Sequence, residues 1–149
     1  MKLVKVKDEF YVRCRQEGTD AELMFNERGR PCVLMVQLHY KNGKHNFVIP
    51  LRSNISGKTP KSQYFSLPPN SETKSGNSHG NHYIKIFPIE SRYIDSYEID
   101  NDSYKMMIKR IIDKNEDKII KACQDYLKEC EKGNAHPMTP DIDGILKWI

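Results

Sequence analysis

The sequence contains no apolar run that approaches the roughly 20 residues needed to cross a bilayer. Residues 1–7 alternate apolar and basic side chains, whereas a secretory signal has a continuous apolar stretch. The four cysteines form no Cys-x-x-Cys pair and no clustered His/Cys ligand spacing. These absences predict a cytoplasmic protein with no membrane partner, whose thiols are buried rather than bound to a metal or joined in disulfides.

Several catalytic signatures are also missing. The sequence has no Gly-x-x-x-x-Gly-Lys-[Ser/Thr] loop, no His-Glu-x-x-His, no dinucleotide fingerprint and no Gly-x-Ser-x-Gly elbow. Acidic residues concentrate in 90–102, with a spacing that fits neither a calcium loop nor a helical carboxylate pair. We therefore expect no metal and no cofactor. A length of 149 residues suits a single domain, residues 1–149.

The basic residues are unevenly distributed. Net charge is only +4, but the segment 41–85 carries seven Lys or Arg and three His against one acid, Glu72. Such a local surplus favours an anionic ligand at this segment, whereas the net charge alone favours a nucleic-acid binder only slightly. A solvated loop face is the alternative interpretation of the same residues.

The hydrophobic pattern predicts an α+β fold. Period-two alternation indicates a strand over 3–7, and 32–40 and 45–49 form a hairpin around the Asn42-Gly43 turn. Apolar residues at helical spacing predict a short helix over 9–16 and two longer ones after Ser103. We expect 51–82 to be irregular, 83–89 to be a strand, and a short helix to follow Asp141. The result is a compact, mostly antiparallel sheet with a helical C-terminal third.

Two segments carry the residue types for phosphate chemistry. In 50–58, Arg52 offers a bidentate fork, Lys58 a point charge, and Ser53 a hydroxyl donor or acceptor. In 78–85, His82 borders a strand and is the better acid/base candidate, whereas His79 lies in a Gly/Ser tract that we expect to be loose. Ordinary surface cations, a turn serine and a structural histidine are the alternatives.

RNA cleavage without a metal needs a base for the 2′-hydroxyl proton, cations for the phosphorane charge and an acid for the 5′-oxygen, and it yields a 2′,3′-cyclic phosphate. The predicted catalytic residues are Ser53, Arg52, Lys58 and His82, although spacing does not show that they converge. The predicted RNA contacts are polar, basic or aromatic residues around them: Arg28, Arg30, Lys41, Lys44, Asn54, Ser56, Lys61, Tyr64 and Lys85.

The order of these elements resembles that of the type III toxin–antitoxin endoribonucleases, which include ToxN, AbiQ, CptN and TenpN. The resemblance runs over most of the chain, with its strongest local matches at Pro50-Leu51-x-Ser53 and Lys85-x-Phe87-Pro88-Ile89. It implies a MazF-like sheet or barrel elaborated with helices. It also implies metal-independent RNA cleavage, with the toxin silenced by pseudoknot repeats of an RNA that it also processes.

The same resemblance implies closed toxin–RNA assemblies, cellular mRNA as substrate, and a role in phage defence by abortive infection or in growth control. Ser53 inherits the family's hydroxyl role, but Arg52 stands where a threonine is common. The lysine of the family's site comes later here, at Lys58 or Lys61, and Arg30 is the nearest match to a basic residue before the central strand. Two alternatives remain: a non-catalytic RNA- or DNA-binding domain, and a protein-interaction module.

Overall fold

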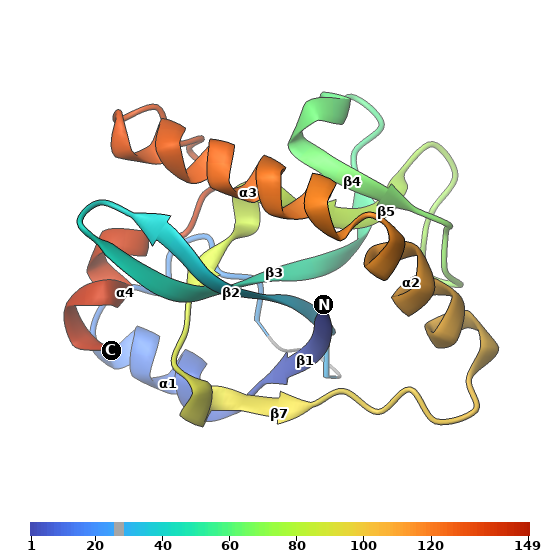
Figure 1. Cartoon of the computed structure of the whole chain (residues 1–149), viewed down its shortest axis with the longest axis horizontal. Coiled ribbons are helices and arrows are strands. Elements are labelled where there is room, and N and C mark those ends of the chain that lie inside the picture. Colours follow the sequence, from blue (N-terminus) through green and yellow to red (C-terminus); the bar gives the residue numbers. More distant parts are fainter. Residues whose placement is uncertain (26–28) are drawn as a thin grey trace.

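The computed structural model describes residues 1–25 and 29–149, which form one sheet flanked by helices (Figure 1). The strands are β1 (Lys2–Val6), β2 (Cys32–Tyr40), β3 (Gly43–Ile55), β4 (Tyr64–Leu67), β5 (Ser78–His82), β6 (Phe87–Pro88) and β7 (Ile94–Ser96). The helices are α1 (Asp8–Gln16), α2 (Ser103–Lys114), α3 (Glu116–Glu131) and α4 (Ile142–Trp148). Short 3₁₀ turns cover Lys61–Gln63, Tyr83–Lys85 and Ser91–Tyr93.

The strands pair antiparallel in the order β4-β5-β3-β2-β1-β7, and β6 adds to β3. β3 is central because it pairs with β2 along its first part and with β5 near its end. Within the described residues β4 and β7 each pair along one edge only, so the sheet stays open rather than closing into a barrel. The predicted α+β class, the antiparallel sheet and the helical C-terminal third are confirmed.

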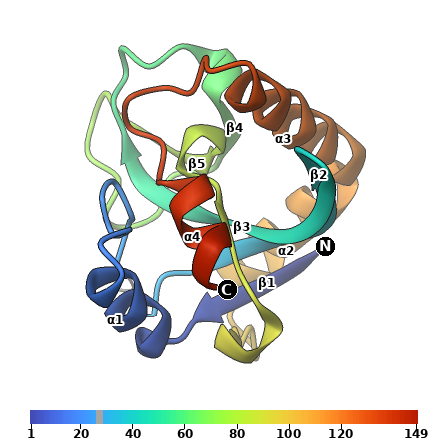
Figure 2. The ribbon, with the colours of Figure 1, turned by 90° about the vertical axis from the view of Figure 1, so that its left-hand side faces the viewer.

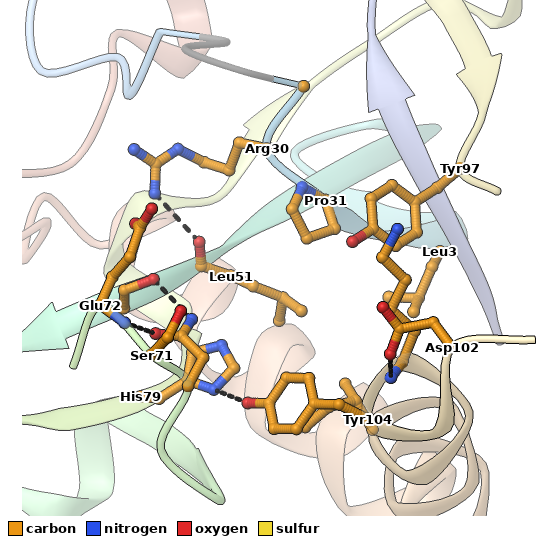
Figure 3. Close-up of a pocket in the computed structure, with 15 residues that line it drawn as sticks. Leu3, Arg30, Pro31, Leu51, Ser71, Glu72, His79, Tyr97, Asp102 and Tyr104 are labelled. Atoms are coloured by element: carbon orange, nitrogen blue, oxygen red, sulfur yellow. Dashed lines mark hydrogen bonds between the residues drawn. The ribbon is translucent and has the colours of Figure 1, made fainter. Parts of the chain in front are cut away.

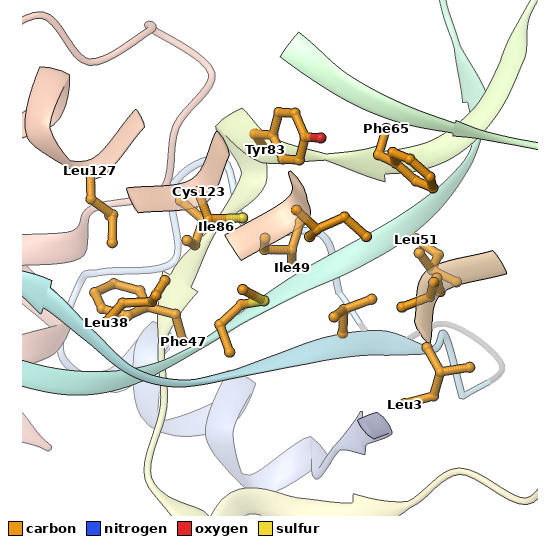
Figure 4. Close-up of a cluster of buried hydrophobic side chains, with 14 of the residues drawn as sticks. Leu3, Leu38, Phe47, Ile49, Leu51, Phe65, Tyr83, Ile86, Cys123 and Leu127 are labelled. Carbon is orange, nitrogen blue, oxygen red and sulfur yellow. The ribbon is translucent and has the colours of Figure 1, made fainter. Parts of the chain in front are cut away.

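Helices α3 and α1 lie on opposite sides of the central strands (Figure 2). Alternation along the strands divides the core in two. Phe47, Ile49 and Leu51 of β3 face α2 and α3, where α3 contributes Cys123 and Leu127 (Figure 4). On the other face, β1, Val48 and Phe87 pack against α1 and α4. Successive side chains of a strand point to opposite faces, so each residue at the end of β3 belongs to one face or the other.

The expectation that residues 51–82 are irregular is wrong, because β3 continues to Ile55 and the segment also contains β4 and β5. β5 has the sequence Ser-His-Gly-Asn-His, which lacks the apolar alternation of a typical strand. Gly80 nevertheless fits there for a steric reason. A Cβ at that position would lie 2.4 Å from the Phe65 carbonyl oxygen on β4, so the two strands approach this closely only because residue 80 has no side chain.

The strand expected over 83–89 is also wrong in most of its length. Tyr83–Lys85 form a 3₁₀ turn in which the Ile86 amide donates to the Tyr83 carbonyl, and only Phe87–Pro88 pair with β3. Proline has no amide hydrogen, which limits further pairing. The hairpin of β2 and β3 and the four helices are confirmed. No helix in the described ranges has the length and hydropathy required to cross a bilayer.

Candidate functional site

A pocket of about 440 Å³ lies beside the end of β3, where β1, β5, the segment before β2, residues 70–72 and the start of α2 come together (Figure 3). Leu3, Leu51 and Ile108 supply apolar side chains to its wall. The polar and charged side chains that line it are Arg30, Ser53, Asn70, Ser71, Glu72, His79, Tyr97, Asp102, Tyr104 and Lys105.

Ser53 enters the pocket because it lies two residues after Leu51, on the same side of β3. The pairing of β3 with β5 is irregular between Arg52 and Ile55, and such irregularities re-aim side chains locally. Asn70 Nδ2 donates to Ser53 Oγ over 2.8 Å. Its Oδ1 accepts from the Glu72 amide at 2.9 Å and from Thr73 Oγ1 at 3.1 Å, which fixes the orientation of the amide group. Because Ser53 Oγ accepts this bond, its own hydroxyl proton is available to a ligand.

His79 is firmly held, so the expectation of a loose residue is wrong. It is 5% exposed on β5, and its Nδ1 lies 2.9 Å from the Pro68 carbonyl oxygen and 3.0 Å from Tyr104 Oη. Tyr104 Oη in turn donates to the same Pro68 oxygen over 2.8 Å. Burial lowers the pKa of His79 from its ordinary value. Strand alternation is the one sequence signal that could have placed His79 on the pocket side. The sequence of β5 is polar throughout, so it shows no apolar alternation from which this could be predicted.

Arg30 reaches the pocket from the segment before β2. Its Nη1 donates to the Leu51 carbonyl over 3.2 Å, while its Nε is buried without a partner among the described residues. The guanidinium places a permanent positive charge next to the strand that carries Ser53.

Arg52 and His82 lie on the opposite face of the same strands. Arg52 pairs with Gly80 and Tyr64 with His82, so these side chains share one side of the sheet. Arg52 Nη1 lies 3.3 Å from His82 Nδ1. Burial, followed by the charges of Arg52, Lys85 and His136, lowers the pKa of His82 to about 4. His82 Nε2 is buried and has no partner in residues 1–25 and 29–149.

The four residues predicted to be catalytic therefore do not converge. Ser53 lines the pocket, Arg52 and His82 face away from it, and Lys58 is exposed in the turn after β3. Alternation along β3 separates Arg52 from Ser53 although they are adjacent in sequence. We call the pocket side of β3 and β5 the inner face and the side of Arg52, Tyr64 and His82 the outer face.

Some of the predicted RNA contacts hold the fold around the pocket. Asn54 Oδ1 accepts from the Lys74 amide and from Asn77, and its Nδ2 donates to the Glu72 carbonyl, so it organises residues 72–77. Lys85 is buried and donates to the Glu22 carbonyl and carboxylate, each over 3.1 Å. These polar groups are engaged within the protein.

The remaining predicted contacts are more distant or more exposed. Ser56 Oγ accepts from the Lys58 amide, and Lys61 is exposed at the 3₁₀ turn before β4. Lys41 and Lys44 lie at the tip of the β2–β3 hairpin, where Lys41 pairs with Asp143. Ser53 lies nine positions after Lys44 in β3, which corresponds to about 30 Å of extended strand. Arg28 lies outside the described residues.

The inner-face pocket thus combines a hydroxyl that can donate, an imidazole held at one nitrogen and a guanidinium around one cavity. Such groups bind phosphate oxygens and transfer protons. Among the described residues no three His, Cys, Asp or Glu side chains gather in a way that could hold a metal ion.

No protein-family model matches the sequence, and no curated protein sequence matches it significantly. Solved structures match it over nearly the whole chain. One belongs to a bacterial antiviral system regulated by a processed non-coding RNA, with 16% identity, a TM-score of 0.69, and coverage of 99% of this chain and 96% of that one. A second comes from a bacterial type III toxin–antitoxin system with selective toxin inhibition by a non-coding RNA pseudoknot, with 15% identity, a TM-score of 0.70, and coverage of 98% and 94%.

A third is AbiQ, a lactococcal anti-phage endoribonuclease of a type III toxin–antitoxin system. It shares 12% identity and a TM-score of 0.68, with coverage of 98% of this chain and 93% of that one. At this identity the likeness concerns the fold. The chain therefore has the fold of the ToxN and AbiQ proteins of type III toxin–antitoxin systems, which confirms at the structural level the resemblance inferred from the order of its sequence elements.

Proposed function

We propose that this protein is an endoribonuclease toxin that cuts RNA without a metal ion and leaves 2′,3′-cyclic phosphate ends. The observation that carries the proposal is the coincidence of two features. The whole chain has the fold of an anti-phage endoribonuclease. The resemblance assigns the hydroxyl role to Ser53, and Ser53 lines a pocket that is also lined by the cation of Arg30 and the imidazole of His79.

In this proposal the scissile phosphate occupies the inner-face pocket. The 2′-oxygen forms a bond to phosphorus as the bond from phosphorus to the 5′-oxygen breaks, so negative charge builds up on the non-bridging oxygens. Ser53 donates its free hydroxyl proton to one of these oxygens, and Arg30, which also lines the pocket, supplies a positive charge that stabilises them. Removal of one such donor typically costs about 10²- to 10³-fold in rate.

The natural inhibitor in this proposal is a structured RNA with pseudoknot repeats, which the enzyme also processes, and the substrate is cellular mRNA. Toxin and RNA would form a closed complex in the cytoplasm and act in phage defence. Support comes from the RNA-inhibited toxins of the same fold and from the basic segment 41–85. Exposed cations such as Lys58 and Lys61 flank the pocket strand and suit the RNA backbone.

The proposal is tested with purified protein, labelled single-stranded RNA and EDTA. The parent should cut the RNA and leave cyclic phosphate ends, and an all-deoxy strand of the same sequence should remain whole because it lacks the attacking 2′-hydroxyl. Ser53→Ala should bind RNA but cut it at least 100-fold more slowly. Binding of RNA without any cleavage by the folded parent would contradict the nuclease proposal.

One observation favours a non-catalytic RNA-binding domain as the second candidate. The resemblance implies a site lysine, yet Lys58 is exposed beyond β3 and the one lysine that lines the pocket, among the described residues, is Lys105 of α2. A binding domain predicts RNA affinity that Ser53→Ala leaves intact and no cleavage by the parent. The EDTA experiment separates the two candidates directly.

A further inference from the structure

His79 is a buried histidine in the wall of the proposed nuclease pocket to which the mechanism above assigns no role. It comes from β5, on the same face as Ser53 of β3. Tyr104, near the start of α2, stacks its ring near the imidazole, with centroids 6.3 Å apart and planes 25° apart. The chain at Pro68 and helix α2 therefore hold this imidazole of β5 in one orientation. Figure 3 shows the bond between His79 and Tyr104.

The hydrogen bonds assign the tautomer of His79. The Pro68 carbonyl oxygen is an acceptor only, so at 2.9 Å Nδ1 must carry the hydrogen and donate it. Tyr104 donates its own proton to the same carbonyl, and its oxygen can accept from Nδ1–H. An unprotonated Nδ1 would instead set two lone pairs against each other at this distance. A neutral His79 therefore carries its hydrogen on Nδ1 and its lone pair on Nε2.

Nε2 is the free end of this arrangement. No hydrogen bond joins it to the described part of the chain, and it is not among the polar atoms sealed from solvent. In Figure 3 the second ring nitrogen of His79 points toward the interior of the pocket, on the side of Leu51. His82 differs from His79 in this respect. Its Nε2 is buried away from solvent, and His82 does not line the pocket of Ser53.

We propose that His79 is the general base of the reaction, a role that rests on the proposed ribonuclease function. Nε2 removes the proton from the 2′-hydroxyl while the 2′-oxygen bonds to phosphorus and the bond to the 5′-oxygen breaks. The departing 5′-oxygen takes a proton from water, and the imidazolium later returns its proton to solvent, so the step is balanced. Tyr104 is a positioning residue that acts through Nδ1.

The surroundings suit a base that is neutral near pH 7. Burial lowers the pKa of His79, and burial also raises the pKa of Tyr104, which keeps its hydroxyl protonated. The other charged or titratable groups that line the pocket are Arg30, Glu72, Tyr97, Asp102 and Lys105. A base of this kind loses activity as acid protonates it, so the acid limb of the rate profile belongs to His79.

The decisive variant is His79→Asn, because an asparagine amide can keep the donor toward Pro68 while it removes Nε2. We expect its kcat/KM to fall by about 10²- to 10⁴-fold, the usual contribution of general acid–base catalysis, with RNA affinity and thermal unfolding close to the parent. The acid limb of the residual activity should disappear. His39→Asn, which alters an exposed histidine of β2, is the matched control and should cut RNA at the parental rate.

A second substrate distinguishes a base from an acid. In an RNA with sulfur in place of the bridging 5′-oxygen, departure of the leaving group needs no proton. The His79→Asn defect should persist on this substrate if His79 is the base. Its disappearance would make His79 the acid and overturn the proposal, as would full activity of a folded His79→Asn variant with the acid limb retained. In that second case the parent still cuts RNA and Ser53→Ala does not, so the ribonuclease function survives. An inactive parent overturns both.

Discussion

The inner and outer faces of strands β3 and β5 each carry a histidine and a polar partner, but they differ in whether these groups reach a pocket. On the inner face, Asn70 holds Ser53, Pro68 and Tyr104 hold His79, and both side chains present a free polar atom to a pocket. On the outer face, Arg52 and His82 contact each other, and His82 Nε2 is sealed inside the protein. A histidine and a partner on adjacent strands thus make a candidate reaction centre on one face and a buried contact on the other. The difference lies in access, which residue type alone does not reveal.

The largest expected effect separates the two faces by rate. Ser53→Ala should lower kcat/KM for RNA at least 100-fold, because it removes a donor to the phosphorane oxygens. Arg52→Ala should lower it less than tenfold, since its side chain points away from that phosphate. Initial rates in EDTA with both variants, matched for thermal unfolding, measure this ratio. A larger loss from Arg52→Ala would place the reaction on the outer face.

The next effect concerns the residue that orients Ser53. Asn70→Asp should slow cleavage by about 10- to 100-fold, because a carboxylate accepts the Ser53 proton and also repels the phosphate. Asn70→Ala should cost less, about tenfold, since it only frees the hydroxyl to rotate. The two rates, compared on one substrate, test whether Ser53 acts as a donor. Equal rates would contradict that role.

Substitution of a buried residue that does not line the pocket should mainly lower the stability of the fold. Lys85→Met should reduce the free energy of unfolding by about 2 kcal/mol, because Lys85 loses two bonds to Glu22 while the half-exposed Glu22 carboxylate can regain water. Urea unfolding followed by circular dichroism measures the change. Cleavage by the folded variant below its midpoint should stay within a few-fold of the parent.

The last effect is a pH dependence of the free energy of unfolding. His82 has a pKa of about 4 when folded, below its value of about 6.5 in an unfolded chain. Between these values the unfolded chain binds more protons, so stability falls as the pH is lowered from about 6.5 to 4. One histidine contributes at most about 1.4 kcal/mol per pH unit. His82→Asn should lose this part of the acid sensitivity in urea unfolding at several pH values, whereas His39→Asn should unfold as the parent does.

Much of the fold follows from the sequence. The apolar β2 strand, the Asn42-Gly43 turn and the helical stripes of α2 and α3 each follow a local rule that the structure obeys. β5 does not, because Asn81 and the two histidines are buried by pairing on both sides rather than by their own hydropathy. The polar sequence of β5 therefore gives no sign of a strand within residues 51–82.

The site was less accessible to prediction for the same reason. Ser53 was identified through the Pro50-Leu51-x-Ser53 match, and it lines the pocket. Its neighbours there come from residues far apart in sequence, such as Asn70 and Tyr104, which no local pattern connects to β3. His82 was preferred to His79 because of its apparent strand border, but the register of β5 with β3 decides which histidine faces the pocket.

The most direct test is a structure of the protein bound to a short RNA that carries a 2′-deoxy nucleotide at the cleavage position and so cannot react. We expect the scissile phosphate to lie in the inner-face pocket, within hydrogen-bond distance of Ser53 Oγ and with the 2′-carbon directed toward His79. A phosphate bound instead against Arg52 and His82 on the outer face would contradict it.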